Sequence, residues 1–344
     1  MYTYTFLGTH ECTEKVGVFY GGSTPNFDPA AYEPKIGKIR ADVRVQDGLV
    51  DGWLPMLRFV YPEKPGDWSE LLIYAPMRVE NANHHVQPVW YRLSRIQGDV
   101  LQSVRYFDSY HPFPPRMESS AEMFYEELVA MRSGWNQALG QSMRIDIPDS
   151  RLANLARHSL VREMMTRVGD LPKYGVFDRG YGGSEHDGFP DTFTADTTAM
   201  LEWGLFDVAR RYIDNYFTYF VRDDGSILYL GPETGQFGRM LTLVAEYAKY
   251  TGDTKLLLRH RRRLDAITKL LLSLRSEALR LPATDPAYGM IAGWSEADAC
   301  LDPDPPRYMK PYFGNSTEAA RGFRELGEVW EHAVQRGGDV ELTR

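Results

Sequence analysis

The stretch ETGQFGRMLTLVAEYAKYTGD, residues 233–253, decides how the second half of this chain folds. Apolar side chains recur in it at helical spacing on two stripes, which consist of Phe237, Leu241, Val244 and Ala248, and of Met240, Leu243 and Tyr247. A helix that is apolar nearly all round is buried, so the pattern predicts a buried helix over 235–250. Gly252 suits the left-handed position that ends a helix, and Asp253 suits the N-cap of the next one.

Helices are also expected on both sides of this segment. Their predicted ranges are 150–168, 193–204, 206–221, 254–277 and 315–335. The connections alternate in length, and the long ones are 169–192, 223–233 and 278–315. In an up-and-down array of helices alternate connections lie at the same end, so the three long connections are expected to share one face. A loop as long as the first is uncommon in a compact domain unless it has a function.

The chain before these helices has the pattern of β-strands. Apolar residues of 39–45 alternate with polar ones, which is the strand period, and Asp47-Gly48 follows as a turn signal. Further apolar runs predict antiparallel strands at 71–74, 89–93 and 100–107. We therefore expect three parts, namely a β-rich, sandwich-like region over 1–117, a linker helix within 118–147 and a helical domain over 148–344.

The composition argues against several classes of function. The formal net charge of -8 argues against a nucleic-acid partner and against polybasic contact with a membrane. Two cysteines provide neither a disulfide framework nor a cysteine-based zinc site. The first residues lack the features of a signal peptide, and no window is apolar enough for a transmembrane helix, so a cytoplasmic location is expected.

Two local motifs do not indicate a cofactor. His84-His85 lies in strand-like sequence, where adjacent side chains point to opposite faces, so a shared metal ion is not expected. The glycine-rich run 180–183 does not follow a strand and is not followed by the Lys-Ser/Thr of a phosphate-binding loop. We therefore expect neither a metal nor another cofactor.

Four stretches of the second half resemble one protein family. They are FTADTTAM at 193–200, DGSI at 224–227, AEYAKYTGD at 245–253, and GWSE at 293–296 with YFGNS at 312–316. Their order and spacing are similar to those of the six-hairpin glycosidase superfamily, the (α/α)6 toroids of glucoamylases, α-L-rhamnosidases and related enzymes. The resemblance covers about 150–341. It implies a mainly α fold, in which a toroid of α/α hairpins follows a β-rich N-terminal region.

Three of the family's six hairpins are visible, so an incomplete toroid is expected. A half toroid exposes its inner helices, which favours a homo-oligomer. The resemblance also implies a glycoside hydrolase that acts on an oligosaccharide or glycoside by inverting acid/base hydrolysis. That chemistry needs two carboxyl groups roughly 6.5–9.5 Å apart.

Glu296 is the expected general acid, because it follows Trp294 by two residues in a long loop and partial burial beside an aromatic ring raises the pKa of a carboxyl group. Asp298 is the substitute for this role. The expected substrate-binding residues are Asp191, Asp196, Glu233, Trp294, Asp187 and Tyr181.

Other interpretations of these residues stay open. A polysaccharide lyase on the same scaffold would use tyrosine, histidine or arginine around a uronate, and Tyr174, Tyr181 and His186 could serve. A carbohydrate-binding protein without catalysis would lack a second carboxylate opposite Glu296. Asp191 also suits the N-cap of the helix that follows it, since helix starts favour acidic side chains.

Overall fold

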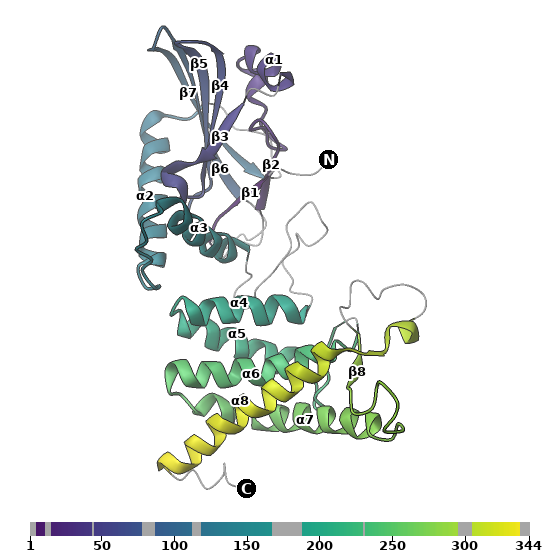
Figure 1. The fold of residues 1–344 in the computed structure, drawn as a ribbon. Coiled ribbons are helices and arrows are strands. Elements are labelled where there is room, and N and C mark those ends of the chain that lie inside the picture. The colour runs from purple at the N-terminus through teal and green to yellow at the C-terminus, as the bar shows by residue number, and fades with distance from the viewer. Residues whose placement is uncertain are drawn as a thin grey trace. The chain divides into compact units, whose positions relative to one another are not determined.

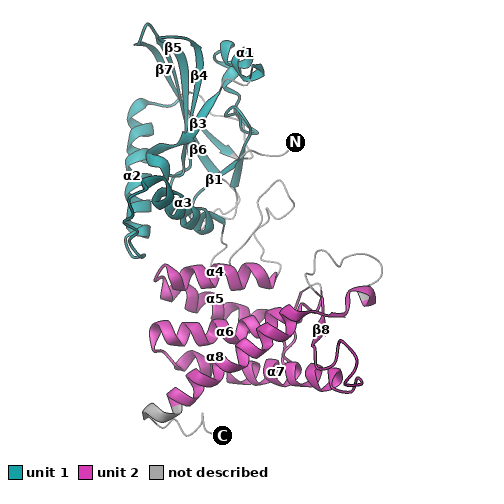
Figure 2. Ribbon diagram, in the orientation of Figure 1, with its two compact units in different colours: residues 1–169, 173–185 teal, residues 170–172, 186–344 magenta. Residues whose placement is uncertain are grey.

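The computed structural model describes the chain over 5–10, 15–42, 45–77, 87–111, 118–166, 188–229, 231–294 and 305–337. It divides into two compact units. The first comprises residues 1–169 and 173–185, and the second comprises residues 170–172 and 186–344 (Figure 2).

An antiparallel sheet of five strands forms the centre of the first unit (Figure 1). Its strands lie in sequence order, namely β3 (Gln46–Leu49), β4 (Met56–Lys64), β5 (Asp67–Tyr74), β6 (Gln87–Gln97) and β7 (Val100–His111). The apolar runs that predicted strands fall in β5, β6 and β7, so the antiparallel β-rich region is confirmed. A second hairpin consists of β1 (Thr5–Gly8) and β2 (Lys15–Val18).

The two faces of the sheet are covered by different elements. Buried Phe59, Ile73 and Tyr91 form the core of one face together with β1, β2 and helix α1 (Lys35–Ala41). On the other face Tyr74 of β5 meets Phe124 of helix α2 (Ala121–Leu139), edge to face at 5.2 Å between ring centres. Helix α3 (Ser150–Thr166) also belongs to this unit, and short 3-10 helices occur at Pro29–Ala31 and Val50–Gly52.

Two local predictions in this region are wrong. The predicted strand over 39–45 begins inside α1, where Ile36 and Ile39 are both buried at a spacing of three residues. A short apolar pattern of this kind fits a helix as well as a strand. The predicted turn at Asp47-Gly48 lies within β3, where Asp47 pairs with Phe59 of β4.

The second unit consists of helices and two very short strands. The helices are α4 (Pro190–Glu202), α5 (Phe206–Tyr219), α6 (Thr234–Thr251), α7 (Lys255–Ala278) and α8 (Phe313–Gly337). Strand β8 (Ala292–Gly293) pairs with β9 (Lys310–Pro311), and a 3-10 turn covers Pro305–Tyr308. Helix α6 is the central helix and contacts all four others (Figure 1). No helix in the described part of the chain is long and apolar enough to cross a membrane.

The predicted buried helix over 235–250 is confirmed as α6. Both of its apolar stripes are buried, and the helix ends at Gly252, whose φ of +71° is the left-handed conformation that glycine tolerates best. Two further glycines bring α6 and α8 close together. A methyl group at Gly238 would overlap the backbone of Glu318, and one at Gly322 would overlap the carbonyl oxygen of Gly238.

The prediction of a mainly helical toroid is wrong. The chain combines a five-stranded sheet unit with a separate helical unit, and among the described residues only α4 to α8 belong to the latter. The helix predicted over 150–168 is α3, which packs against β1 and the 3-10 turn at Val50–Gly52 in the sheet unit. Helical periodicity identifies α3 as a helix, but it carries no information on which unit the helix joins.

Candidate functional site

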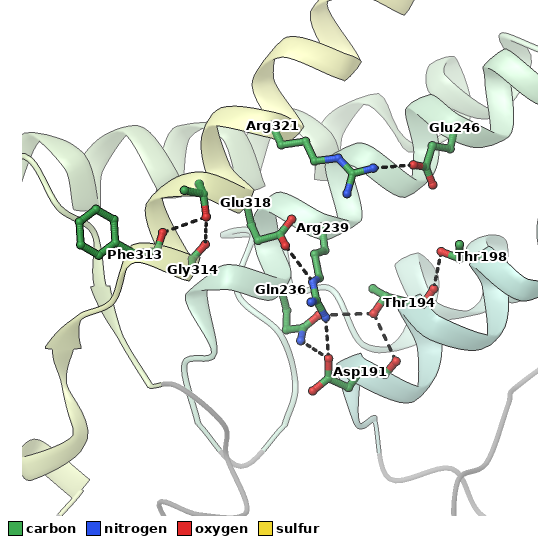
Figure 3. Close-up of polar contacts among 11 residues, drawn as sticks. Asp191, Thr194, Thr198, Gln236, Arg239, Glu246, Phe313, Gly314, Glu318 and Arg321 are labelled. Carbon is green, nitrogen blue, oxygen red and sulfur yellow. Dashed lines mark hydrogen bonds and ion pairs between the residues drawn. The ribbon is translucent and has the colours of Figure 1, made fainter.

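The N-terminal parts of α4, α6 and α8 meet through a chain of polar contacts (Figure 3). Arg239 of α6 forms ion pairs with Asp191 of α4 at 2.9 Å and with Glu318 of α8 at 3.3 Å. Gln236 of α6 also donates a hydrogen bond to Asp191. Each of these helices follows one of the long connections, so the N-terminal parts of the three helices lie together, while 167–187 and 295–304 of the connections lie outside the described residues.

A pocket of about 310 Å³ lies between these three helices. Helix α4 contributes a stripe at four-residue spacing, helix α6 contributes the middle of the pocket, and helix α8 contributes two charged side chains one turn apart. The lining residues are Thr194, Ala195, Thr198, Ala199, Glu202, Arg239, Thr242, Leu243, Glu246, Glu318 and Arg321. The volume is at the lower end of the range for small-molecule sites, and the lining is mostly polar.

Glu246 is the carboxyl group of this pocket with a perturbed pKa. Burial raises its pKa above the usual value, the Arg321 guanidinium opposes that effect, and the negative charges of Glu325 and Glu202 add to it. The side chain is half-buried, and its Oε1 accepts a hydrogen bond from Nη2 of Arg321 at 2.8 Å. The net direction is upward because desolvation of the carboxylate outweighs the attraction of one partly exposed cation.

Two polar atoms at the pocket have unused hydrogen-bonding capacity. Thr242 is 4% exposed, and its Oγ1 has no hydrogen-bond partner among the described residues. Glu318 uses Oε1 for Arg239, while its buried Oε2 accepts no hydrogen bond from the same part of the chain. The hydroxyls of Thr194 and Thr198, by contrast, donate to backbone carbonyl oxygens of their own helix. A buried polar atom without a partner costs free energy, so a ligand that supplies one would gain affinity.

Two of the predicted binding residues lie on α4. Asp191 is brought to the pocket rim through Arg239. Its predicted role as N-cap is wrong, because the helix starts two residues earlier with Phe189 as N-cap and Pro190 in the first position. Asp196 is half-buried on the same helix, and it is not among the residues that line the pocket.

Glu233 and Trp294 lie in neighbouring connections beside the start of α6. Glu233 is 2% exposed and occupies the N-cap position, and its side chain makes no capping hydrogen bond. The backbone nitrogen of Trp294 donates to the carbonyl oxygen of Pro232 at 2.9 Å, and the indole meets the ring of Tyr308 edge to face. These contacts join the second and third long connections, but neither side chain lines the pocket between the three helices.

The remaining predicted site residues lie outside the described part of the chain. These are the proposed acid Glu296, its substitute Asp298, and the binding residues Asp187 and Tyr181. The same holds for Tyr174, His186 and His84-His85.

Sequence reasoning missed the charged residues of the pocket, because an isolated charge on a helix resembles a solvated surface residue. One signal was available. Arg239, Thr242 and Glu246 follow each other at steps of three and four, so they form a polar stripe along a helix whose other faces are buried and apolar.

The comparisons with known proteins give no family for this chain. No family model, no curated protein and no solved structure matches it. Within the residues that the structure describes, no group of three or more His, Cys, Asp or Glu side chains is arranged to hold a metal ion. The candidate site therefore depends on the geometry of the three helices alone.

Proposed function

We propose that the helical unit binds a carbohydrate in the pocket between α4, α6 and α8 and hydrolyses a glycosidic bond by inverting acid/base catalysis. The observation that carries the proposal is the pair of carboxyl groups on facing helices. Glu246 has a raised pKa, and Glu318 is a carboxylate in an ion pair with Arg239. Two carboxyl groups in different environments are what a general acid and a general base require.

The roles follow from these environments. Glu246 holds its proton to a higher pH than an ordinary glutamate, so it is the group that can protonate the leaving oxygen of the glycoside. Glu318 lines the pocket, and its Oε2 accepts no hydrogen bond from the described residues, so we assign to this carboxylate the acceptance of a proton from water. Threonine hydroxyls and the guanidinium of Arg321 line the space between, where they can bind sugar hydroxyls.

Sequence motifs support the same class of chemistry and suggest a different acid, Glu296. Lyase chemistry is not proposed for this pocket, because the described residues that line it include no tyrosine and no histidine, and its two arginines are held by carboxyl groups of the protein. The two candidate acids are separable by mutation, since Glu246 is on α6 and Glu296 is in the third long connection.

The test is hydrolysis of a panel of oligosaccharides and aryl glycosides, with the anomeric form of the product followed by proton NMR. We expect Glu246→Gln and Glu318→Gln each to lower kcat about 100-fold or more, as the loss of a general acid or base does. Glu277→Gln removes an exposed carboxylate of α7 outside the pocket and serves as the matched control with unchanged kcat.

Three outcomes would overturn parts of this proposal. Full activity of Glu246→Gln together with inactivity of Glu296→Gln would move the acid to Glu296. A retained anomeric configuration would exclude the inverting mechanism. Binding of oligosaccharides without any hydrolysis would leave a carbohydrate-binding protein in place of an enzyme.

A further inference from the structure

The charges around the pocket are unbalanced. With Glu246 protonated as the proposed acid, three carboxylates of the described residues remain, those of Glu202 and Glu318 in the pocket wall and that of Asp191 on Arg239, against the two guanidinium groups of Arg239 and Arg321. Lys249 does not restore the balance, because it forms ion pairs with Glu325 and Glu328, which lie one and two turns beyond Arg321 on α8. The site therefore carries an excess of negative charge.

The two arginines are already engaged by protein carboxylates. Arg239 is held from both sides by Asp191 and Glu318. Arg321 gives one nitrogen to Glu246. A ligand with a carboxylate would have to displace these contacts and would also meet the surplus of negative charge, so an acidic sugar is disfavoured.

The acceptors, in contrast, are available. Glu202 ends the α4 stripe, is exposed, and makes no hydrogen bond or ion pair with the described residues. Among the described residues the buried Oε2 of Glu318 accepts no hydrogen bond. The buried Oγ1 of Thr242 likewise has no partner in that part of the chain, and this observation is independent of the charges. The carboxylates offer acceptors only and the hydroxyl can accept or donate, so a ligand rich in donors suits the pocket.

We propose that the sugar bound in this pocket carries a protonated amine, as an unacetylated hexosamine unit does, and that Glu202 is the carboxylate that binds the ammonium group. This rests on the proposed function only in so far as the pocket is taken to bind a carbohydrate. A divalent cation is the less suitable occupant, because no group of three ligating side chains is arranged for one among the described residues. The sugar hydroxyls then bind Thr242 and those N–H groups of Arg321 that make no hydrogen bond with the described residues.

The test is isothermal titration calorimetry on the full chain with three oligosaccharides of equal length and linkage, namely a glucosamine oligomer, its N-acetylated form and the neutral glucose oligomer. We expect the amino form to bind about twofold to fivefold more tightly than either of the others, as one exposed charge pair allows. The advantage should shrink when salt rises from about 50 mM to about 300 mM, because salt screens exposed charges.

Two variants locate the amine. Glu202→Gln is expected to remove most of the preference for the amino form over the N-acetylated form, whereas the matched control Glu277→Gln on α7 should keep it. Equal binding of the amino and N-acetylated oligomers, or no binding of any of the three, would overturn the inference. So would a preference that survives in Glu202→Gln.

The outcomes separate this inference from the proposed function. Hydrolysis of neutral oligosaccharides at the rate of the amino form would refute the amine preference and leave the hydrolase standing. Tight binding of the amino form without hydrolysis would refute the hydrolase and leave the amine site standing.

Discussion

Replacement of Gly322 by alanine should separate α6 from α8 and so disturb the pocket without touching any of its polar groups. The new methyl group would overlap the carbonyl oxygen of Gly238 and approach the Cβ of Leu241 at 3.0 Å. The first of these atoms belongs to the backbone, so a rotamer change cannot relieve the overlap. The helices must move apart.

The expected size follows from two opposing terms. Overpacking a tight interface costs about 1–3 kcal/mol. Alanine in place of glycine inside a helix stabilises the helix by up to about 1 kcal/mol. Because the clash is with backbone, we expect an overpacking cost of about 2–3 kcal/mol. After the gain in helix propensity is subtracted, Gly322→Ala should lower the free energy of unfolding by about 1–2 kcal/mol. For a unit of this size each kcal/mol lowers the unfolding temperature by about 2–4 °C.

The assay is thermal unfolding followed by far-ultraviolet circular dichroism, with Gly327→Ala as the matched control. Gly327 lies on the same helix, and nothing is within 4 Å of the Cβ that it would gain. The control should therefore keep the wild-type unfolding temperature or raise it. Equal unfolding temperatures for the two variants would refute the claim that the glycines set the distance between α6 and α8.

Two further predictions concern pH and helix capping. Burial lowers the pKa of His260 below its usual value of 6.5, despite the hydrogen bond to Asp214. The stability that neutral His260 contributes is therefore full above about pH 6.5 and is lost as pH falls through the lower pKa of the folded state. His260→Gln should flatten the decline of the urea midpoint between about pH 7 and pH 5, and an unchanged slope would contradict this. Ser120 caps α2 through a hydrogen bond from the backbone nitrogen of Met123 at 3.1 Å; Ser120→Ala should cost about 1 kcal/mol in urea unfolding, whereas Ser120→Asp, which keeps a capping oxygen, should cost little.

The helices and most strands of this chain were predictable because their signals are local. The two apolar stripes of α6 need no information from elsewhere in the chain, and Gly252 marks its end by its own conformational preference. The error at Ile39 has a physical reason. A short segment with four apolar residues fits the helical period and the strand period about equally well. Contact with the rest of the core, which includes Ile36, decides between helix and strand.

The assembly of the elements was not predictable in the same way. The prediction that α3 completes a helical toroid failed because the partner of an amphipathic helix is decided by tertiary contacts, and α3 finds them in the sheet unit. The pocket depends on two glycines that let α8 approach α6. Only that approach places Glu318 beside Arg239, and no spacing in the sequence connects them.

The most direct test of the central claim is the leaving-group dependence of Glu246→Gln. A general acid is needed when the leaving group is a poor one, such as a sugar hydroxyl, and is dispensable when the leaving group is as good as a dinitrophenolate. If Glu246 is the acid, the variant should lose about 100-fold or more in kcat on the natural type of glycoside and nearly nothing on the dinitrophenyl glycoside. An equal loss on both substrates, or no loss on either, would contradict the assignment of this pocket as the catalytic site.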